Sequence, residues 1–325
     1  MRWLAKAGVA LVIVAVAPMF ADPVMAQGAD SPSATAPPGP TSDPDPDPEV
    51  LALDTERNQR VTVPVTIAGQ GPFDFMIDTG SQATVLSHDL ADRLGLTDRK
   101  LATVIGISSR MEAEIAPVQA FTLGSRVFDI EKVPLMDQAN IGSADGILGL
   151  DSLQEQRVLL DFKQNTFAVA DARALGGNRG YDIVVRARRQ LGQLIITSAE
   201  LDGVKVALIV GTGAQGSVGN FALRNRLRGR DLGEATMTDI NGVTQTSDMR
   251  MAKLVEIGRA RITNFPIAFV DSPTFEELGL GDRPALLLGM SELRLFERVA
   301  IDFKERKVLF DLPRDVRWHA PGQSF

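Results

Sequence analysis

A single carboxylate between two apolar stretches is the first candidate for chemistry in this sequence. Residues 73–86 read FDFMIDTGSQATVL, so Asp78 follows one apolar run and a Thr79-Gly80 turn leads into the next. An Asp buried between hydrophobic strands is costly unless its charge is hydrogen-bonded or has a chemical task. Asp78 is therefore the candidate for acid–base chemistry.

The other reactive residue types exclude several kinds of site. The chain has no cysteine, so disulfides and thiol catalysis are excluded. Its two histidines, His88 and His319, are far apart and lack metal-ligand spacing, so neither a zinc site nor a Ser-His-Asp triad is expected. The net charge of −7 gives no general attraction to nucleic acid or to an anionic membrane.

The elements that must position Asp78 are predicted to be strands. Apolar residues alternate with polar ones over residues 61–67, which is the period of a half-buried strand, and Gly69-Gln70-Gly71 supplies a turn. Ser87 is placed to cap a short helix over residues 88–95. Further strands are predicted over 102–107, 111–123 and 127–135, so the chain is mainly β.

The second half of the chain repeats the first. The repeat pairs FMIDTGSQATVLS (75–87) with LIVGTGAQGSVGN (208–220), DGILGLDSL (145–153) with ALLLGMSEL (285–293), and VLLDFKQNTFAV (158–169) with VAIDFKERKVLF (299–310). Repeats of this length are whole lobes. We therefore expect lobe 1 at 49–171, a linker at 172–180 and lobe 2 at 181–313.

The DTGS loop followed by DGILGL resembles the bacterial retropepsin-like aspartyl proteases of the pepsin and retropepsin superfamily. The resemblance implies an all-β fold with two similar β-barrel-like lobes related by a pseudo-two-fold axis. It implies a peptide or protein substrate, a water nucleophile and no cofactor or metal. Asp78 would be the catalytic residue, and Thr79, Gly80 and Ser81 would form its loop.

The second lobe departs from the family pattern. The family uses two aspartates that face each other across the lobe junction, but the position aligned with Asp78 is Gly211. Thr212 and Gly213 remain, and by resemblance such residues interlock the two loops beneath the site. Lobe 2 thus keeps the loop and lacks the carboxylate.

Three arrangements follow from Gly211. Two chains could form a homodimer through lobe 1 and bring together two copies of Asp78. The lobes of one chain could instead pair and leave a lone Asp78. The third arrangement keeps that pairing in an impaired pseudopeptidase that binds peptides without cutting them. Asp202 or Asp239 could substitute for the missing acid, although neither has supporting spacing.

The flap expected in this fold is a hairpin that closes over the substrate. Thr103–Ile115 occupies the corresponding place, with Gly106 as a hinge and Ile105 and Ile107 as apolar cover. An ordinary surface hairpin is the alternative. The lobe 2 counterpart is expected around Asn241-Gly242.

Several other motifs have rival interpretations. Residues 211–216 match G-x-G-x-x-G, with Asp231 further along, as in a dinucleotide site, but the repeat already explains these glycines. The arginines of lobe 2 are interpreted as solvated faces. Asp145, Asp161 and Asp302 are interpreted as structural turn residues.

The N-terminal end of the chain indicates export. Residues 1–26 combine Arg2 and Lys6 with an apolar run and small residues ending at Ala26, as in a cleavable signal peptide. The apolar run of about 14 residues is shorter than the ~20 needed to span a bilayer, so no stable membrane anchor is expected. Residues 27–48 are rich in Pro and Asp and predict a disordered linker. Residues 314–325 are a C-terminal tail. The predicted location is periplasmic or secreted.

Overall fold

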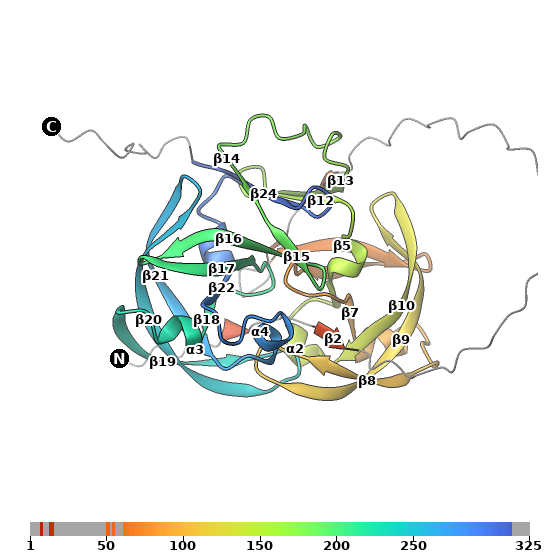
Figure 1. Ribbon diagram of the computed structural model, residues 1–325. Coiled ribbons are helices and arrows are strands. Elements are labelled where there is room, and N and C mark those ends of the chain that lie inside the picture. Colours follow the sequence, from red (N-terminus) through yellow and green to blue (C-terminus); the bar gives the residue numbers. More distant parts are fainter. Residues whose placement is uncertain (1–6, 9–12, 16–49, 53, 56–60, 314–325) are drawn as a thin grey trace, which may run out of the picture.

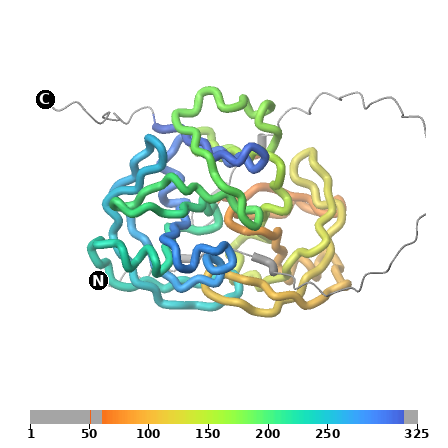
Figure 2. Tube along the Cα trace, viewed as in Figure 1, coloured from red at the N-terminus to blue at the C-terminus, as the bar shows by residue number. Residues whose placement is uncertain are grey.

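The structure is a computed structural model that describes residues 7–8, 13–15, 50–52, 54–55 and 61–313. In these residues β-strands predominate and the helices are short. Figure 1 shows two β-lobes side by side and a further sheet across one end of both. In Figure 2 the yellow and orange part of the chain forms lobe 1, and the teal and blue part forms lobe 2. The predicted all-β, two-lobe architecture is confirmed.

Lobe 1 is a nine-stranded sheet that curls on itself. Its order is β2-β8-β9-β10-β7-β11-β6-β5-β4, and a further pairing of β9 with β5 brings distant parts of the sheet together. Alternate residues of β5 (Val61, Val63 and Val65) are buried while Pro64 is exposed, as the period-2 pattern predicts. The other strands are β2 (Ile13–Ala15), β4 (Asp54–Thr55), β6 (Gln70–Ile77), β7 (Val85–Ser87), β8 (Lys100–Ile105), β9 (Arg110–Leu123), β10 (Arg126–Met136) and β11 (Gly146–Leu148).

Lobe 2 repeats this sheet strand for strand. Its order is β1-β19-β20-β21-β18-β22-β17-β16-β15, and β20 pairs additionally with β16. The two lobes therefore share one topology, as the internal repeat predicts. The strands of lobe 2 are β1 (Ala7–Gly8), β15 (Arg188–Gln190), β16 (Gln193–Leu201), β17 (Val204–Val210), β18 (Ser217–Asn220), β19 (Arg230–Thr238), β20 (Thr244–Ile257), β21 (Ala260–Val270) and β22 (Ala285–Leu288).

A third sheet contains strands from both halves of the chain. Its order is β14 (Ile183–Arg186), β24 (Lys307–Asp311), β23 (Arg298–Asp302), β12 (Arg157–Asp161), β13 (Thr166–Ala170) and β3 (Val50–Ala52). The central pairing is antiparallel and joins β12 of the first half to β23 of the second. Arg157 and Asp302 form a fully buried ion pair there, with 2.8 Å between Nη2 and Oδ2. This sheet fixes the lobes relative to each other.

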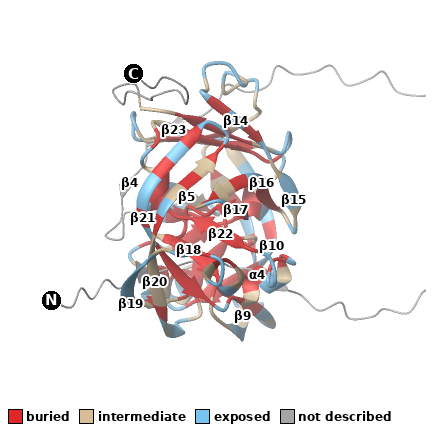
Figure 3. Ribbon diagram, turned by 60° about the vertical axis from the view of Figure 1, so that its left-hand side comes forward, coloured by how far each residue is buried: buried red, intermediate tan, exposed pale blue. Residues whose placement is uncertain are grey.

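Short helices close the ends of the sheets. They are α1 (His88–Arg93), α2 (Gln138–Ile141), a 3-10 helix (Leu150–Ser152), α3 (Phe221–Arg224), α4 (Pro273–Glu277) and α5 (Met290–Leu293). The Ser87 hydroxyl accepts from the Leu90 N–H at 3.1 Å, which confirms the predicted helix cap. Figure 3 shows the buried residues concentrated on the inner strands β17, β18 and β22, with exposed residues towards the outer hairpins.

The N-terminal part of the chain contributes only two short strands to the described residues. β2 pairs antiparallel with β8, and β1 pairs parallel with β19. The remainder of the predicted leader (1–26), the predicted linker (27–48) and the predicted tail (314–325) lie outside the described residues. Within the described part of the chain, no helix combines the length and the apolar character needed to cross a membrane.

Candidate active site

Asp78 lies at the end of β6, in the seam between the lobes. Its side chain is fully buried, and its N–H donates to the Leu148 carbonyl at 3.0 Å. The adjacent Gly149 permits this arrangement because a Cβ there would lie 2.3 Å from the carbonyl group of Ala83. Only glycine allows the backbone of the ILG triplet to pass so close to the Asp78 loop.

The Asp78 carboxylate is held by backbone amides from both lobes. Its Oδ1 accepts from the Gly80 N–H at 2.8 Å and from the Gly213 N–H at 3.2 Å. Hydrogen bonds from amides to a carboxylate stabilise its negative charge and fix its orientation. The Ser81 N–H donates to the Asp78 carbonyl at 3.1 Å and closes the turn. The geometry therefore presents an oriented buried carboxylate at the pseudo-two-fold axis.

Thr79 and Thr212 interlock the two loops. The Thr79 hydroxyl donates to the Val210 carbonyl at 2.9 Å, and the Thr212 hydroxyl donates to the Ile77 carbonyl at 2.7 Å. The Thr79 N–H also donates to the Thr212 hydroxyl at 3.0 Å. The loops of one chain thus pair with each other, which places residues 78–81 and 211–213 together.

Gly211 occupies the backbone position opposite Asp78. Its N–H donates to the Leu288 carbonyl at 3.1 Å, just as the Asp78 N–H donates to Leu148. A Cβ on Gly211 would lie 2.8 Å from two carbons of the Leu287 side chain. The space that a second acid would need is therefore filled by Leu287.

Two glutamines strengthen the seam. The side chain of Gln193, which is buried in lobe 2, donates to the Gly80 carbonyl, and the side chain of Gln82 donates to the Leu191 carbonyl at 2.5 Å. Sequence reasoning missed both residues. A glutamine at the start of a strand, as Gln193 is, or in a loop, as Gln82 is, carries no local signal for a partner in the other lobe.

Each loop is supported from behind by a hydroxyl and an acid. In lobe 1 the Thr84 hydroxyl donates to Asp151 at 2.6 Å. Part of the Asp151 residue is exposed, but desolvation of its carboxyl by the surrounding protein raises its pKa despite this bond. In lobe 2 the Ser217 hydroxyl donates to Glu292 at 2.5 Å, and burial raises the pKa of Glu292 to about 7. These acids sit beneath the loops and brace them.

The expected flap is the hairpin formed by β8 and β9. Ile105, Gly106 and Ile107 at its tip are all buried, and they approach the β19–β20 hairpin of lobe 2. The backbone of Gly106 is not left-handed. Instead, a Cβ at Gly106 would lie 2.5 Å from Oδ2 of Asp239, so glycine is required there by close approach.

The other candidate carboxylates have structural partners. Asp202 accepts from the N–H groups of Lys253 and Leu254, and Asp145 accepts from the Asp74 N–H and from Arg93. Asp161 and Asp302 each accept a backbone N–H three residues ahead, as expected for turn residues. Asp239 contacts Ser109 of the lobe 1 hairpin.

The rival ligand sites lack their structural context. Residues 211–216 lead into strand β18, so no helix N-terminus follows the G-x-G-x-x-G pattern to hold a pyrophosphate. Among the described residues no group of three or more His, Asp or Glu side chains could hold a metal ion. Among the lobe 2 arginines that pair with acids are Arg224 with Asp248 and Arg189 with Glu155.

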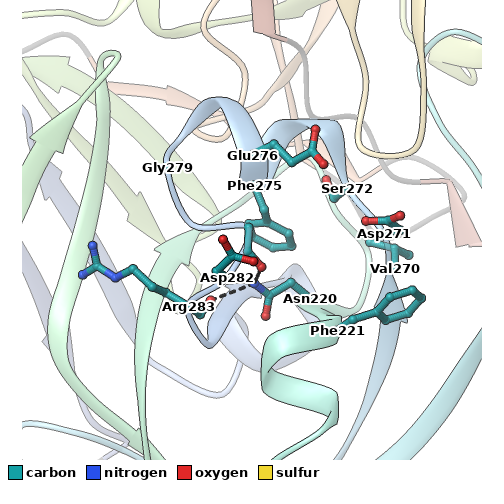
Figure 4. Close-up of a pocket in the computed structure, with 11 residues that line it drawn as sticks. Asn220, Phe221, Val270, Asp271, Ser272, Phe275, Glu276, Gly279, Asp282 and Arg283 are labelled. Carbon is teal, nitrogen blue, oxygen red and sulfur yellow. Dashed lines mark hydrogen bonds between the residues drawn. The ribbon is translucent and has the colours of Figure 1, made fainter.

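A cavity of about 450 Å³ lies away from Asp78, between α3 and α4 of lobe 2 (Figure 4). Phe221, Asp271, Glu276 and Asp282 are among the residues that line it. All of its lining residues belong to lobe 2, so the cavity is separate from the seam that holds the catalytic candidate.

The comparison with protein families agrees with this geometry. A family model described as "Aspartyl protease" matches residues 63–152 and 197–291, which together make up more than half of the chain. The first region contains Asp78 and the second contains Gly211. No curated protein matches the sequence.

Proposed function

The chain belongs to the aspartyl protease family, and we propose that it is an exported peptidase in which Asp78 activates the attacking water. The observation that carries this proposal is the Asp78 carboxylate, buried at the seam and held by amides of both loops. Asp78 would take a proton from water as the water oxygen bonds to the peptide carbonyl carbon. It would return the proton to the nitrogen that leaves when the C–N bond breaks.

The binding mode we propose is strand addition. The N-terminal strand β2 pairs with β8 over Thr103–Ile105, and β1 pairs with β19 at Met237 and Thr238. Extended peptides bind exposed sheet edges through the same main-chain hydrogen bonds. The edges of the two hairpins thus accept an extended chain, which supports a peptide or protein substrate.

The second candidate function is peptide binding without cleavage. Residue 211 is a glycine, so the loops supply no second carboxyl group to donate a proton to the carbonyl oxygen, and Leu287 fills the space in front of it. A mixed peptide library incubated at pH 4–8 and analysed by mass spectrometry separates the two functions. We expect Asp78-dependent cleavage. Cleavage that persists in Asp78→Asn would contradict the peptidase proposal, and binding without cleavage would support the alternative.

The matched control for Asp78→Asn is Asp145→Asn. Asp145 lies beside the ILG triplet but is bonded to Asp74 and Arg93, and we expect its variant to keep activity. Sedimentation velocity tests the possible homodimer through lobe 1. Because the lobe 1 loop is already paired with lobe 2, we propose that one chain is the active unit.

Export is the remaining part of the proposal. The N-terminal sequence supports a cleavable signal peptide that ends at Ala26 and a periplasmic or secreted location. N-terminal sequencing of the chain recovered outside the cytoplasm should begin at Gln27. A chain that stays with the cytoplasmic fraction and begins at Met1 would contradict export.

A further inference from the structure

Two hairpins, one from each lobe, meet at their tips. The lobe 1 flap is β8–β9 with the turn 106–109, and the lobe 2 flap is β19–β20 with the turn 239–243. In Figure 1 both hairpins lie along the same side of the molecule and run towards each other. We propose that these tips form a latch in which Asp239 holds the lobe 1 flap and that access to Asp78 opens only when Asp239 releases it. This inference concerns access to the proposed peptidase site and therefore rests on that function.

The two carboxylate oxygens of Asp239 accept hydrogen bonds from different hairpins. Oδ1 accepts from the N–H groups of Asn241 and Val243 at 3.1 and 3.0 Å, within its own flap. Oδ2 accepts from the Ser109 hydroxyl at 2.6 Å and the Ser108 N–H at 3.3 Å, across the lobe junction. The residue is 1% exposed. Its own hairpin thus orients the carboxylate, and the opposite flap completes its hydrogen bonding.

The lobe 1 flap is shaped to receive this carboxylate. Gly106 leaves room for Oδ2, because any Cβ there would overlap Asp239. The side chain of Asn241 adds a bond to the Ser109 hydroxyl at 2.8 Å. In that bond the Asn241 amide donates, and the Ser109 hydroxyl in turn donates to Asp239, so each tip both donates to and accepts from the other.

Apolar residues at the tips cross between the lobes. Ile105 and Ile107 of the lobe 1 flap pack in a lobe 2 cluster that includes Leu287. Ile240 of the lobe 2 flap packs in a lobe 1 cluster that includes Ile147. Leu287 and Ile147 belong to the strands behind the Thr-Gly loops. Each closed tip thus packs into the apolar cluster next to the opposite loop.

A second set of contacts anchors the lobe 1 flap to α4. The Thr274 hydroxyl donates to the Gly106 carbonyl at 2.9 Å, and Arg110 pairs with Glu277 at 2.7 Å. The hydroxyl bond is buried, whereas the ion pair lies at the partly exposed rim, where such pairs contribute little. The latch therefore depends on Asp239, on the buried Thr274 bond and on the apolar tips, and little on the ion pair.

The closed latch leaves two polar atoms unsatisfied. The Ser108 Oγ and the Asn241 Oδ1 are buried and have no hydrogen-bond partner within the described residues. Opening the flaps would give both atoms access to water, which offsets part of the loss of the Asp239 bonds. These two unsatisfied atoms lower the free-energy cost of opening the tips.

Cross-linking tests the latch directly, because the chain has no native cysteine. In the full chain, Ser109→Cys and Asn241→Cys are joined by a short bis-thiosulfonate reagent that a reducing agent removes. We expect the association rate of a fluorescent apolar peptide to fall at least about tenfold in the cross-linked chain and to recover on reduction. The two single-cysteine variants, treated with the same reagent, are the controls.

Hydrogen exchange gives a readout that needs no enzymatic activity. In Asp239→Asn, amides of the two turns should exchange about tenfold faster or more, because a hydrogen bond to a charged group is lost. Asp202→Asn, which removes a carboxylate bonded only within lobe 2, should leave both turns unchanged. Unchanged exchange in Asp239→Asn, or equal peptide association in cross-linked and reduced chains, would overturn the latch. Gated binding without any cleavage would keep the latch and reject the peptidase proposal.

Discussion

Leu287 fills the space in front of Gly211: a Cβ at that glycine would lie 2.8 Å from the leucine Cγ and Cδ1. Lobe 2 therefore differs from lobe 1 in the side chain next to the loop as well as in the missing acid. Its counterpart in lobe 1, Ile147, occupies the same place in the sheet next to Asp78, since β11 pairs with β6 as β22 pairs with β17. Restoring the acid requires that the neighbouring side chain change as well.

Gly211→Asp alone should destabilise the chain and raise activity little. Overpacking against Leu287 costs about 1–3 kcal/mol. Gly211→Asp with Leu287→Ile copies lobe 1 and should recover stability. A second acid that donates a proton to the carbonyl should then raise the cleavage rate about 100-fold. Thermal unfolding and kcat for a fixed peptide check both variants. Equal behaviour of the single and double variants would refute the role of Leu287.

Thr212→Val should loosen the seam. It removes the hydroxyl that bonds to Ile77 and Thr79, so a buried N–H and a carbonyl lose their partner. We expect the free energy of unfolding to fall by about 1–3 kcal/mol, as measured in urea. Thr197→Val, on the exposed face of β16, is the control and should change it by less than about 0.5 kcal/mol.

Glu292 should make stability depend on pH. Its pKa is about 7 in the folded chain and 4.5 normally, so the folded state holds its proton more tightly. Protonated Glu292 stabilises the folded chain by about 3 kcal/mol at most in the free energy of unfolding. This stabilisation is fully present below about pH 4.5 and is lost as the pH rises towards 7.

Urea unfolding of the parent and of Glu292→Gln across this range measures that contribution. The difference between the two pH profiles isolates Glu292, because Asp151, whose pKa is also raised, is present in both chains. Glu234→Gln, on the exposed part of β19, should reproduce the parent curve. Parallel curves for the parent and Glu292→Gln would show that Glu292 does not titrate in this range.

Asp302→Asn should strongly destabilise the shared sheet. Asp302 Oδ2 accepts from Nε and Nη2 of Arg157 at 3.1 and 2.8 Å, and both side chains are buried. Removing one partner of a buried ion pair costs about 3–5 kcal/mol. Breaking the exposed pair Arg261–Glu256 by Glu256→Gln should cost less than about 1 kcal/mol. Similar losses in the two variants would mean that burial of the pair is unimportant.

Most of the fold followed from local signals and from the internal repeat. The alternation over Val61–Ile67 marked a strand, Ser87 marked a helix cap, and the paired Thr-Gly loops predicted two matching lobes. These features depend on neighbours in sequence or on a copy elsewhere in the chain.

The features that were missed depend on contacts between the halves. Gln193 and Leu287 are ordinary residues until the lobes come together, and no periodicity marks their partners. The sequence predicts Gly106 as a hinge. In the structure, the absence of a Cβ at Gly106 instead leaves room for Asp239 from the other lobe. Contacts between residues of different lobes cannot be predicted from the sequence pattern of one strand.

The continuity of the chain through both lobes has an evolutionary consequence. In a symmetric pair of identical subunits, every substitution is made twice, so a loop that loses its acid loses both copies. Here the halves are encoded separately and held by the β12–β23 pairing, and each can diverge by itself. Covalent linkage thus allows Asp78 to face Gly211, and Asp239 to meet Gly106, as complementary rather than identical partners.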